Sequence, residues 1–251
     1  MPLNREDVIS RCKVLAVATV YDVLDKMGYP NQALSAEIQP LARGYRLAGP
    51  AFTVYGTSTA AYDGTRGSAM SYAMFRSIQS GDVIVFDTGG HKIGGPWGAN
   101  TGANAKARGA AGIVLDGGTR DARDLIDLCF PTYCRFLTPV LAHGRFQVEG
   151  FNVPISVSGQ VQERVRVNPG DFVLGDDDGV VIIPQPLLEE VLKYSEAATV
   201  AEVQIREALE AGEDREEVDR RIDRWALLKG RRSLKLEEPS MPFGGSTEHE
   251  N

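Results

Sequence analysis

The sequence lacks the features that mark membrane-spanning and exported proteins. Its 251 residues contain no apolar run of about 18 or more, the length that a helix needs to cross a bilayer. The first residues, MPLNREDVISRCKV, carry charges where a signal peptide needs an apolar core. We therefore expect a soluble protein, with the cytoplasm as its location.

Cysteine and excess positive charge are also scarce. The three cysteines, Cys12, Cys129 and Cys134, have no CxxC spacing, and the four residues between Cys129 and Cys134 include no histidine, so we expect reduced thiols rather than a zinc site or a disulfide. The chain has 27 Lys and Arg against 34 Asp and Glu, a net charge of −7. Because a phosphate backbone requires a basic face, direct binding of nucleic acid is not expected.

Two common nucleotide-binding motifs are missing. The segment GGHKIGG follows a predicted strand, but its glycines do not have the G-x-G-x-x-G spacing of a dinucleotide site. No Gly-Lys-Ser or Gly-Lys-Thr is present to form a P-loop. These absences leave the Gly-rich segments free for another role.

The elements that are present predict an α/β fold with parallel strands. Between residues 81 and 126 an apolar strand, a small-residue helix, a second strand and a second helix follow one another, as in βαβ units. We predict one α/β domain over residues 1–230, with N-terminal helices and a C-terminal helical extension, and a disordered tail over residues 231–251. Thr19 is the predicted cap of a helix that ends at Gly28. One or two long charged helices are predicted over residues 186–230, with a stop at Gly212.

The segment PWGANTGA is typical of a strand end followed by a helix N-terminus. Free N–H groups and the positive end of a helix dipole bind a carboxylate or phosphate without a cationic side chain. Gly98 would let a ligand approach the backbone, and the small residues that follow would let the helix pack closely. The alternative is a tightly packed turn with no ligand, and spacing alone does not exclude it.

A second polar turn follows in LDGGTRDARDLI. We predict that Asp116, Gly117 and Gly118 form a turn after a strand, which places Arg120 and Asp121 at the start of the next helix, where α/β sheets bind ligands. Arg120 could contact a carboxylate or keto acid with two nitrogens, and Asp121 could hold a divalent cation. Alternatively, Asp121 caps the helix and has no other role.

These segments, together with TVYDVLDKMG and PGDFVLGDDDGVVIIP, resemble the class II pyruvate aldolases that cleave 4-hydroxy-4-methyl-2-oxoglutarate. That family also includes the regulator of ribonuclease E activity and chains mislabelled as menaquinone methyltransferases. The resemblance covers residues 15–215 and is most specific over residues 97–121. It implies a β/β/α swivelling domain of the ribonuclease-activity-regulator type with a long C-terminal helix, assembled as a trimer or a dimer of trimers with sites between subunits.

The resemblance also implies roles for individual residues. The backbone amides of Gly98, Ala99, Asn100 and Thr101 would bind the carboxylate of pyruvate, and Arg120 would contact the keto oxygen and the carboxylate. Asp121 would hold Mg²⁺ or Mn²⁺, partly through water. A glutamate from the C-terminal helix of a neighbouring subunit would complete the site, Glu202 being the first choice and Glu196 the second.

One position departs from the aldolase pattern, which has an acid twenty residues before the Arg-Asp pair. Ala99 stands there. If that acid helps a bound water act as a base, its loss should slow aldol cleavage by about 10²–10⁴. Decarboxylation of a keto acid such as oxaloacetate needs no such base, so we expect it to survive. His91 is an alternative base or a structural residue, and His143 and His249 have weaker claims.

The residues, together with what the resemblance implies, leave three functions open. The first is a metal-dependent carbon–carbon lyase acting on a pyruvate-derived keto acid, as an oxaloacetate-type decarboxylase, a 4-hydroxy-4-methyl-2-oxoglutarate-type aldolase, or both. The second is a non-catalytic oligomer that regulates a protein partner. The third is an enzyme of the same fold with altered chemistry on another carboxylate. The intact Arg120 and Asp121 favour an enzyme.

Overall fold

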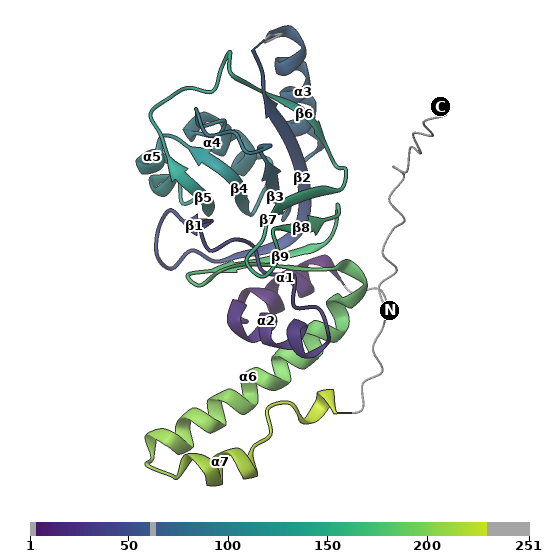
Figure 1. The fold of residues 1–251 in the computed structure, drawn as a ribbon, viewed down its shortest axis with the longest axis vertical. Coiled ribbons are helices and arrows are strands. Elements are labelled where there is room, and N and C mark those ends of the chain that lie inside the picture. Colours follow the sequence, from purple (N-terminus) through teal and green to yellow (C-terminus); the bar gives the residue numbers. More distant parts are fainter. Residues whose placement is uncertain (1–3, 61–63, 230–251) are drawn as a thin grey trace, which may run out of the picture.

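A computed structural model describes residues 4–60 and 64–229 of the chain. The predicted tail of residues 231–251 and His249 lie outside these residues. The helices are α1 (Arg5–Lys13), α2 (Val17–Lys26), α3 (Gly64–Ser77), α4 (Ala99–Ala107), α5 (Ala122–Asp127), α6 (Leu188–Glu210) and α7 (Arg215–Arg221), with short 3-10 helices at Gln185–Leu187 and Ala226–Leu228. Figure 1 shows α3, α4 and α5 around a curved sheet, and α1, α2, α6 and α7 gathered below it.

The sheet is mixed and strongly curved, so that it is nearly closed. Its strands run in the order β1-β5-β4-β3-β2-β9-β10, β6 also pairs with β2, and β7 and β8 form a separate hairpin. The strands are β1 (Gln39–Pro40), β2 (Leu47–Ser58), β3 (Val83–Asp87), β4 (Gly112–Thr119), β5 (Thr132–Leu137), β6 (Phe146–Phe151), β7 (Ile155–Ser158), β8 (Arg164–Val167), β9 (Phe172–Asp176) and β10 (Gly179–Ile183). The long strand β2 joins the two halves, because it pairs with β9 through its first residues and with β3 and β6 through the rest.

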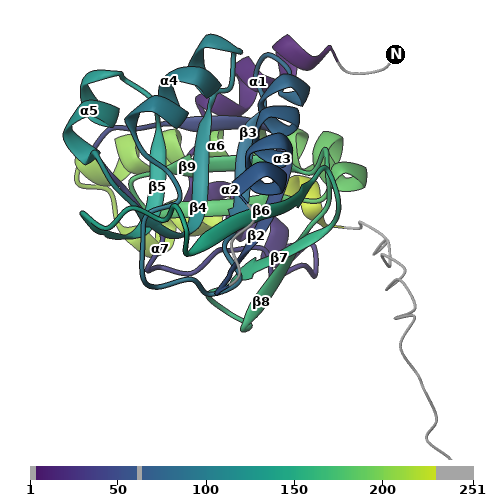
Figure 2. The ribbon, with the colours of Figure 1, turned by 90° about the horizontal axis from the view of Figure 1, so that it is seen from above.

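The parallel part of the sheet confirms the predicted βαβ units. Strands β2, β3, β4 and β5 pair in parallel, and α3, α4 and α5 are the crossovers between them (Figure 2). The first four residues of β3 and all of β4 are buried, which agrees with their continuous apolar sequence. This arrangement brings the carboxyl ends of the strands, and the loops that follow them, to one edge.

The predicted cap of α2 was wrong. The helix begins at Val17, so Thr19 lies inside it, and the N-cap residue, Ala16, has no capping side chain. The carboxylate of Asp176 at the end of β9 instead accepts the Val17 N–H at 2.9 Å. A tertiary contact therefore replaces the local cap. The predicted end is confirmed, since Gly28 has the left-handed φ of +92° that suits a helix terminus.

The predicted turn at residues 116–118 was also wrong. Strand β4 continues through Gly117 and Gly118 to Thr119, with an irregular register against β5. Both glycines are needed for close packing: a Cβ on Gly117 would lie 2.6 Å from Thr88 Oγ1, and one on Gly118 would lie 2.3 Å from the Phe136 ring. The Gly-Gly pair therefore marks crowding within the strand and not a reversal of the chain.

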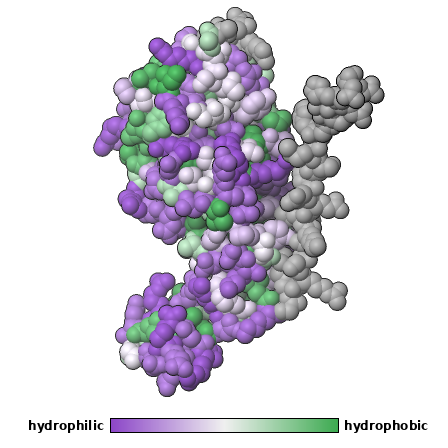
Figure 3. Space-filling view, viewed as in Figure 1, coloured by the Kyte–Doolittle hydropathy of each residue, from purple (hydrophilic) through white to green (hydrophobic). Residues whose placement is uncertain are grey.

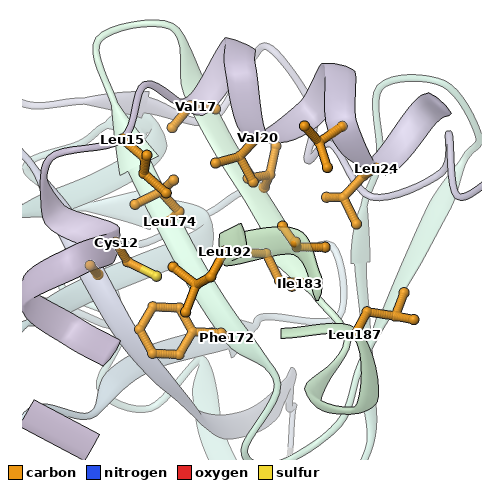
Figure 4. Packing of buried hydrophobic residues seen from close by; sticks show 14 of the residues in the cluster. Cys12, Leu15, Val17, Val20, Leu24, Phe172, Leu174, Ile183, Leu187 and Leu192 are labelled. Atoms are coloured by element: carbon orange, nitrogen blue, oxygen red, sulfur yellow. The ribbon is translucent and has the colours of Figure 1, made fainter. Parts of the chain in front are cut away.

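The core that joins the helices to the sheet lies between α1, α2, α6 and strands β9 and β10. Figure 4 shows its apolar side chains interdigitating, and ten of them are labelled: Cys12, Leu15, Val17, Val20, Leu24, Phe172, Leu174, Ile183, Leu187 and Leu192. Complete burial of one such aliphatic side chain contributes about 1.5–3 kcal/mol. This packing fixes the root of α6 against the sheet.

The C-terminal extension forms a helical arm, defined here as α6 and α7 with the residues up to 229. The prediction of long charged helices with a stop at Gly212 is confirmed, since α6 ends at Glu210 and Gly212 has a φ of +85°. The arm leaves the body in Figure 1, and Figure 3 shows it as mainly hydrophilic with a hydrophobic patch. Among the described residues, no helix is both long enough and apolar enough to cross a membrane.

The three cysteines are free thiols, as predicted. Burial raises the pKa of Cys12 to about 12 and that of Cys134 to about 11, whereas Cys129 is exposed. Because the thiolate is the reactive form, we expect a disulfide reagent such as DTNB to modify one thiol in the native protein at pH 8 and all three after denaturation. Fast reaction of two thiols in the native state would contradict the burial.

Candidate functional site

Two segments twenty residues apart meet at the carboxyl edge of the parallel strands. Trp97, just before α4, pairs with Thr119 at the end of β4. The carbonyl oxygen of Trp97 accepts the Arg120 N–H at 3.0 Å and the Thr119 hydroxyl at 3.1 Å. One helix and one strand separate the segments in sequence. The twenty residues between position 99 and Arg120 are therefore the length of one α4–β4 unit, which returns the chain to the same edge.

Gly98 is in direct contact with the Arg-Asp pair. A Cβ at this position would lie 2.6 Å from Asp121 Oδ2 and 3.0 Å from Arg120 Cγ. Its backbone is extended, so the glycine is required by lack of space and not by its dihedral angles. A side chain here would displace the carboxylate of Asp121.

The first turn of α4 has open N–H groups, although fewer than predicted. The Gly98 N–H donates to Thr101 Oγ1 at 2.8 Å, and the Ala99 N–H donates to Asp121 Oδ2 at 3.2 Å. Within the described part of the chain, the N–H groups of Asn100 and Thr101 have no acceptor. Of the four predicted amides, those of Asn100 and Thr101 are open. The Gly98 amide is used by the Thr101 side chain, and the Ala99 amide holds the carboxylate of Asp121.

Asp121 lies at the N-cap position of α5 but does not cap it. Its backbone is left-handed, with φ 57° and ψ 40°, and its side chain makes no capping hydrogen bond. For a residue other than glycine, this conformation costs about 1–2 kcal/mol. The side chain instead turns towards α4 and Arg120. Of the two interpretations left open by the sequence, simple capping does not describe this geometry.

Arg120 and Asp121 leave some of their polar atoms available. The Arg120 Nε donates to Asp121 Oδ1 at 3.1 Å, and both side chains are about one-third exposed. The two terminal nitrogens of Arg120 make no hydrogen bond to any residue of ranges 4–60 and 64–229. A planar carboxylate or keto acid could therefore accept from them without displacing a protein partner.

The metal ligands within one chain are few. Among the described residues, no group of three or more His, Cys, Asp or Glu side chains could surround an ion. The single carboxylate of Asp121 fits Mg²⁺ or Mn²⁺, since Mg²⁺ commonly keeps several waters and binds one or two carboxylates plus oxygens of the substrate. It does not fit a site that requires a full set of protein ligands.

The two candidate glutamates lie on α6, away from the Arg120 edge of the same chain (Figure 1). Glu202 Oε2 accepts from the Thr19 hydroxyl at 3.0 Å, and its Oε1 accepts from Arg224 at 2.8 Å. Arg11 makes two hydrogen bonds to Glu196, at 2.7 and 2.9 Å, and holds the pKa of that carboxyl below its usual range. One chain therefore does not bring either glutamate to Asp121.

The sequence did not reveal the role of Arg224. Besides its bond to Glu202, it donates to Asp22 on α2 at 2.9 Å and stacks on Trp225 at 4.3 Å. It thereby ties the end of the arm to α2 and α6. In the sequence, Arg224 is marked only by the adjacent Trp225, and an Arg-Trp pair does not by itself predict a contact.

His91 is a structural residue. It is 2% exposed, its Nε2 accepts the Gly94 N–H at 3.0 Å, and its Nδ1 lies 2.6 Å from Ser58 Oγ. Because Nε2 is an acceptor, the proton is on Nδ1, which donates to Ser58. Burial lowers the pKa of His91, which keeps the ring neutral. Both nitrogens are thus engaged, and of the two roles open in the sequence the structural one fits.

The comparisons with known proteins agree with this fold. A family model named RraA-like, with the description Aldolase/RraA, matches residues 17–182, which is more than half of the chain. The chain belongs to the RraA-like family. The matched part includes Gly98, Arg120 and Asp121 and ends before α6, so the RraA-like match does not extend to Glu196, Glu202 or the arm.

Individual relatives carry both names of the family. A protein of Halalkalibacterium halodurans called a putative 4-hydroxy-4-methyl-2-oxoglutarate aldolase is 36% identical over 74% of this chain and 81% of its own length. The 4-hydroxy-4-methyl-2-oxoglutarate aldolase of Thermus thermophilus is 32% identical over 43% of this chain and 62% of its own. The crystal structure of Streptomyces coelicolor RraAS2, an unusual member of the RNase ES inhibitor RraA family, aligns with a TM-score of 0.69 and 27% identity over 82% of this chain and 99% of that one.

Proposed function

We propose that this RraA-like protein is a divalent-metal-dependent lyase that breaks a carbon–carbon bond in a pyruvate-derived keto acid. The proposal depends on one observation: Arg120, Asp121 and the open amides of α4 converge on one exposed edge. The aldolase names of two relatives support the reaction class. Because Ala99 replaces the acid of the aldolase pattern, we favour decarboxylation of an oxaloacetate-type substrate over aldol cleavage.

Each of these residues would bind a different part of the substrate. The N–H groups of Asn100 and Thr101, at the positive end of α4, bind the carboxylate of the keto acid. The terminal nitrogens of Arg120 donate to its oxo group, where negative charge develops. Asp121 would hold Mg²⁺ or Mn²⁺, which when bound supplies Lewis-acid stabilisation of the enolate. The Ala99 N–H and Arg120 keep the carboxylate of Asp121 oriented towards this position.

Decarboxylation requires no catalytic group beyond these residues and the metal. The bond between C3 and the leaving carboxylate breaks, its electron pair forms the enolate of pyruvate, and CO₂ departs. A proton from solvent then adds to C3. Aldol cleavage additionally requires a base for the C4 hydroxyl. Ala99 has no such group, and both nitrogens of His91 are engaged.

The assembly belongs to the proposal as well. We place the arm of one subunit beside the Arg120 edge of another, in a trimer or a dimer of trimers, since one chain alone leaves both arm glutamates far from its own edge. There Glu202 would take part through lone pairs that Thr19 and Arg224 leave free, for example by accepting from a water. Glu196, held by two bonds to Arg11, is the weaker candidate.

Pyruvate release from oxaloacetate, coupled to lactate dehydrogenase, tests the function. We expect release above the rate with Mg²⁺ or Mn²⁺ alone, and its loss when EDTA is added. A rate equal to that of free metal at every protein concentration would reject the lyase. The protein-free metal control is essential because divalent ions decarboxylate oxaloacetate slowly by the same Lewis-acid effect.

A second function, a non-catalytic oligomer that binds a protein partner, is kept because of Ala99 and because RraAS2 is named with an inhibitor family. It predicts no pyruvate release, even with metal bound. It also predicts that substitution of Arg120 leaves partner binding intact unless the edge is the interface. An altered enzyme acting on another carboxylate would bind pyruvate but release none from oxaloacetate.

Replacing Gly98 with alanine should weaken metal binding more than stability. The new Cβ would push the Asp121 carboxylate away from the Ala99 N–H, but a flexible side-chain end moves easily, so the free energy of unfolding should change by about 1 kcal/mol or less. We expect Mn²⁺ affinity, measured by calorimetry, to fall about tenfold or more. The exposed Ala103 of α4 gives the control Ala103→Ser. Unchanged affinity would mean that Gly98 serves packing only.

A further inference from the structure

A charged cavity lies beside the loop that connects β3 to α4. It has a volume of about 530 Å³ and is formed by the loops after β3 and before β1 and by strands β4 and β5. Its lining residues are Glu37, Gly90, His91, Lys92, Asp116, Gly117, Arg135 and Phe136. We call it the Arg135 cavity. None of the residues assigned to the keto-acid site lines it.

Arg135 is held in place from beneath by a buried acid. Its Nη1 donates to Asp116 Oδ1 at 3.0 Å and to Ser158 Oγ at 2.8 Å, and the side chain of Asp116 is only 4% exposed. Asp116 Oδ2 in turn accepts the N–H and the hydroxyl of Ser158 at 2.8 and 2.9 Å. The guanidinium is therefore fixed in direction before any ligand arrives.

On its other side Arg135 has a partner that is easily exchanged. Its Nη2 is paired with Glu37, whose side chain is 65% exposed. An ion pair this exposed stabilises a protein little, because water screens it and ordering the side chain costs entropy. The carboxylate of Glu37 thus occupies the place that the carboxylate of a ligand could take.

The rest of the lining favours a particular kind of anion. Lys92, exposed at the cavity, has no ion-pair or hydrogen-bond partner among the residues that the structure describes. His91 is neutral and fully hydrogen-bonded, so it adds no charge. Phe136 supplies an apolar wall, and Gly90, where a Cβ would meet nothing within 4 Å, leaves open space at the cavity.

We infer that the Arg135 cavity binds an organic carboxylate with an apolar body, whose carboxylate displaces Glu37 and lies between Arg135 and Lys92 while its apolar part packs on Phe136. This site is separate from the proposed keto-acid site and does not depend on it. It shares a loop with that site, because Lys92 and Gly98 belong to the same connection between β3 and α4.

Calorimetry with benzoate, acetate and inorganic phosphate tests the inference on the full chain. Benzoate has no oxo group next to its carboxylate, so it probes the cavity without imitating a keto acid. We expect benzoate to bind more tightly than acetate or phosphate. Glu37→Gln should tighten its binding about threefold, since the internal competitor loses its charge, and Lys92→Met should weaken it about threefold or more. Glu163→Gln and Lys13→Met, both at exposed positions, are the controls.

The opposite responses of two variants protect the test against misfolding, which would weaken binding in both. Weaker or unchanged binding in Glu37→Gln, no effect of Lys92→Met, or equal affinity for the three anions would overturn the inference. Undetectable binding of benzoate to the wild type and to Glu37→Gln would do so too. Neither set of results bears on pyruvate release, so the two proposals fail separately.

Discussion

Asp121→Asn should reduce metal-dependent pyruvate release from oxaloacetate by about 10²-fold or more. Asparagine has nearly the same shape and tolerates the left-handed backbone of this position, so the fold and the contact with the Ala99 N–H can persist. What is lost is the charge that holds the cation and, with it, the stabilisation of the enolate, a contribution of several kcal/mol. Initial rates at saturating Mn²⁺, together with Mn²⁺ affinity, measure the effect.

The control for this experiment is Asp124→Asn, an exposed acid in the first turn of the same helix. It removes an equal charge without touching the Arg120 edge and should keep the wild-type rate. If Asp121→Asn also kept that rate, the metal would have to be held elsewhere, and the proposed site would be wrong. A lower melting temperature of Asp121→Asn alone would show that the residue is structural.

Ala99→Glu should introduce or increase aldol cleavage of 4-hydroxy-4-methyl-2-oxoglutarate by about 10²–10⁴ in kcat/KM, the usual contribution of a general base. An acid in the first turn of α4 is favoured by the helix dipole. It would lie beside Asp121, whose carboxylate already accepts the N–H of residue 99. The two acids repel each other unless a cation is present, so the gained activity should require metal more strictly than decarboxylation does.

Ala103→Glu is the matched control, because Ala103 is exposed and lies one turn further along α4. It should leave both activities unchanged. A gain in aldol cleavage from both variants would point to a general effect of charge on the helix. If Ala99→Glu gained nothing while oxaloacetate was still decarboxylated, the base would have to come from a neighbouring subunit, and Ala99 would not explain the specificity of this chain.

Much of the fold could be predicted where local rules and tertiary packing agree. The apolar run of β3 and the small residues of α4 each predict one element, and the structure confirms them. Of the one or two charged helices predicted over residues 186–230, the structure shows α6 and α7. Thr19 and the Gly117–Gly118 pair were misread for a common reason. A threonine and a glycine pair are local signals for a cap and a turn, but here a distant carboxylate and two crowded neighbours act on the same atoms.

The candidate site was predictable in composition but not in geometry. Twenty residues separate position 99 from Arg120, which is one helix–strand unit, so the sequence indicates that the two segments lie at one edge. The spacing does not reveal that Asp121 has a left-handed backbone, that Thr101 consumes the Gly98 N–H, or that both nitrogens of His91 are occupied. Each of these three features depends on contacts between a side chain and residues of other helices or strands.

The sequence by itself determined the family, the parallel βαβ order, and the presence of an Arg-Asp pair with alanine at the acid position. These are properties of residue order, since periodicity and spacing follow directly from it. Only the tertiary structure decided which amides of α4 remain open and that Arg135 is fixed by a buried acid. It also decided that Glu196 is paired with Arg11 of α1 and Glu202 with Arg224, away from Asp121. The physical reason is that hydrogen bonds and ion pairs are exclusive: an atom held by one partner is not available to another, and only the folded chain assigns the partners.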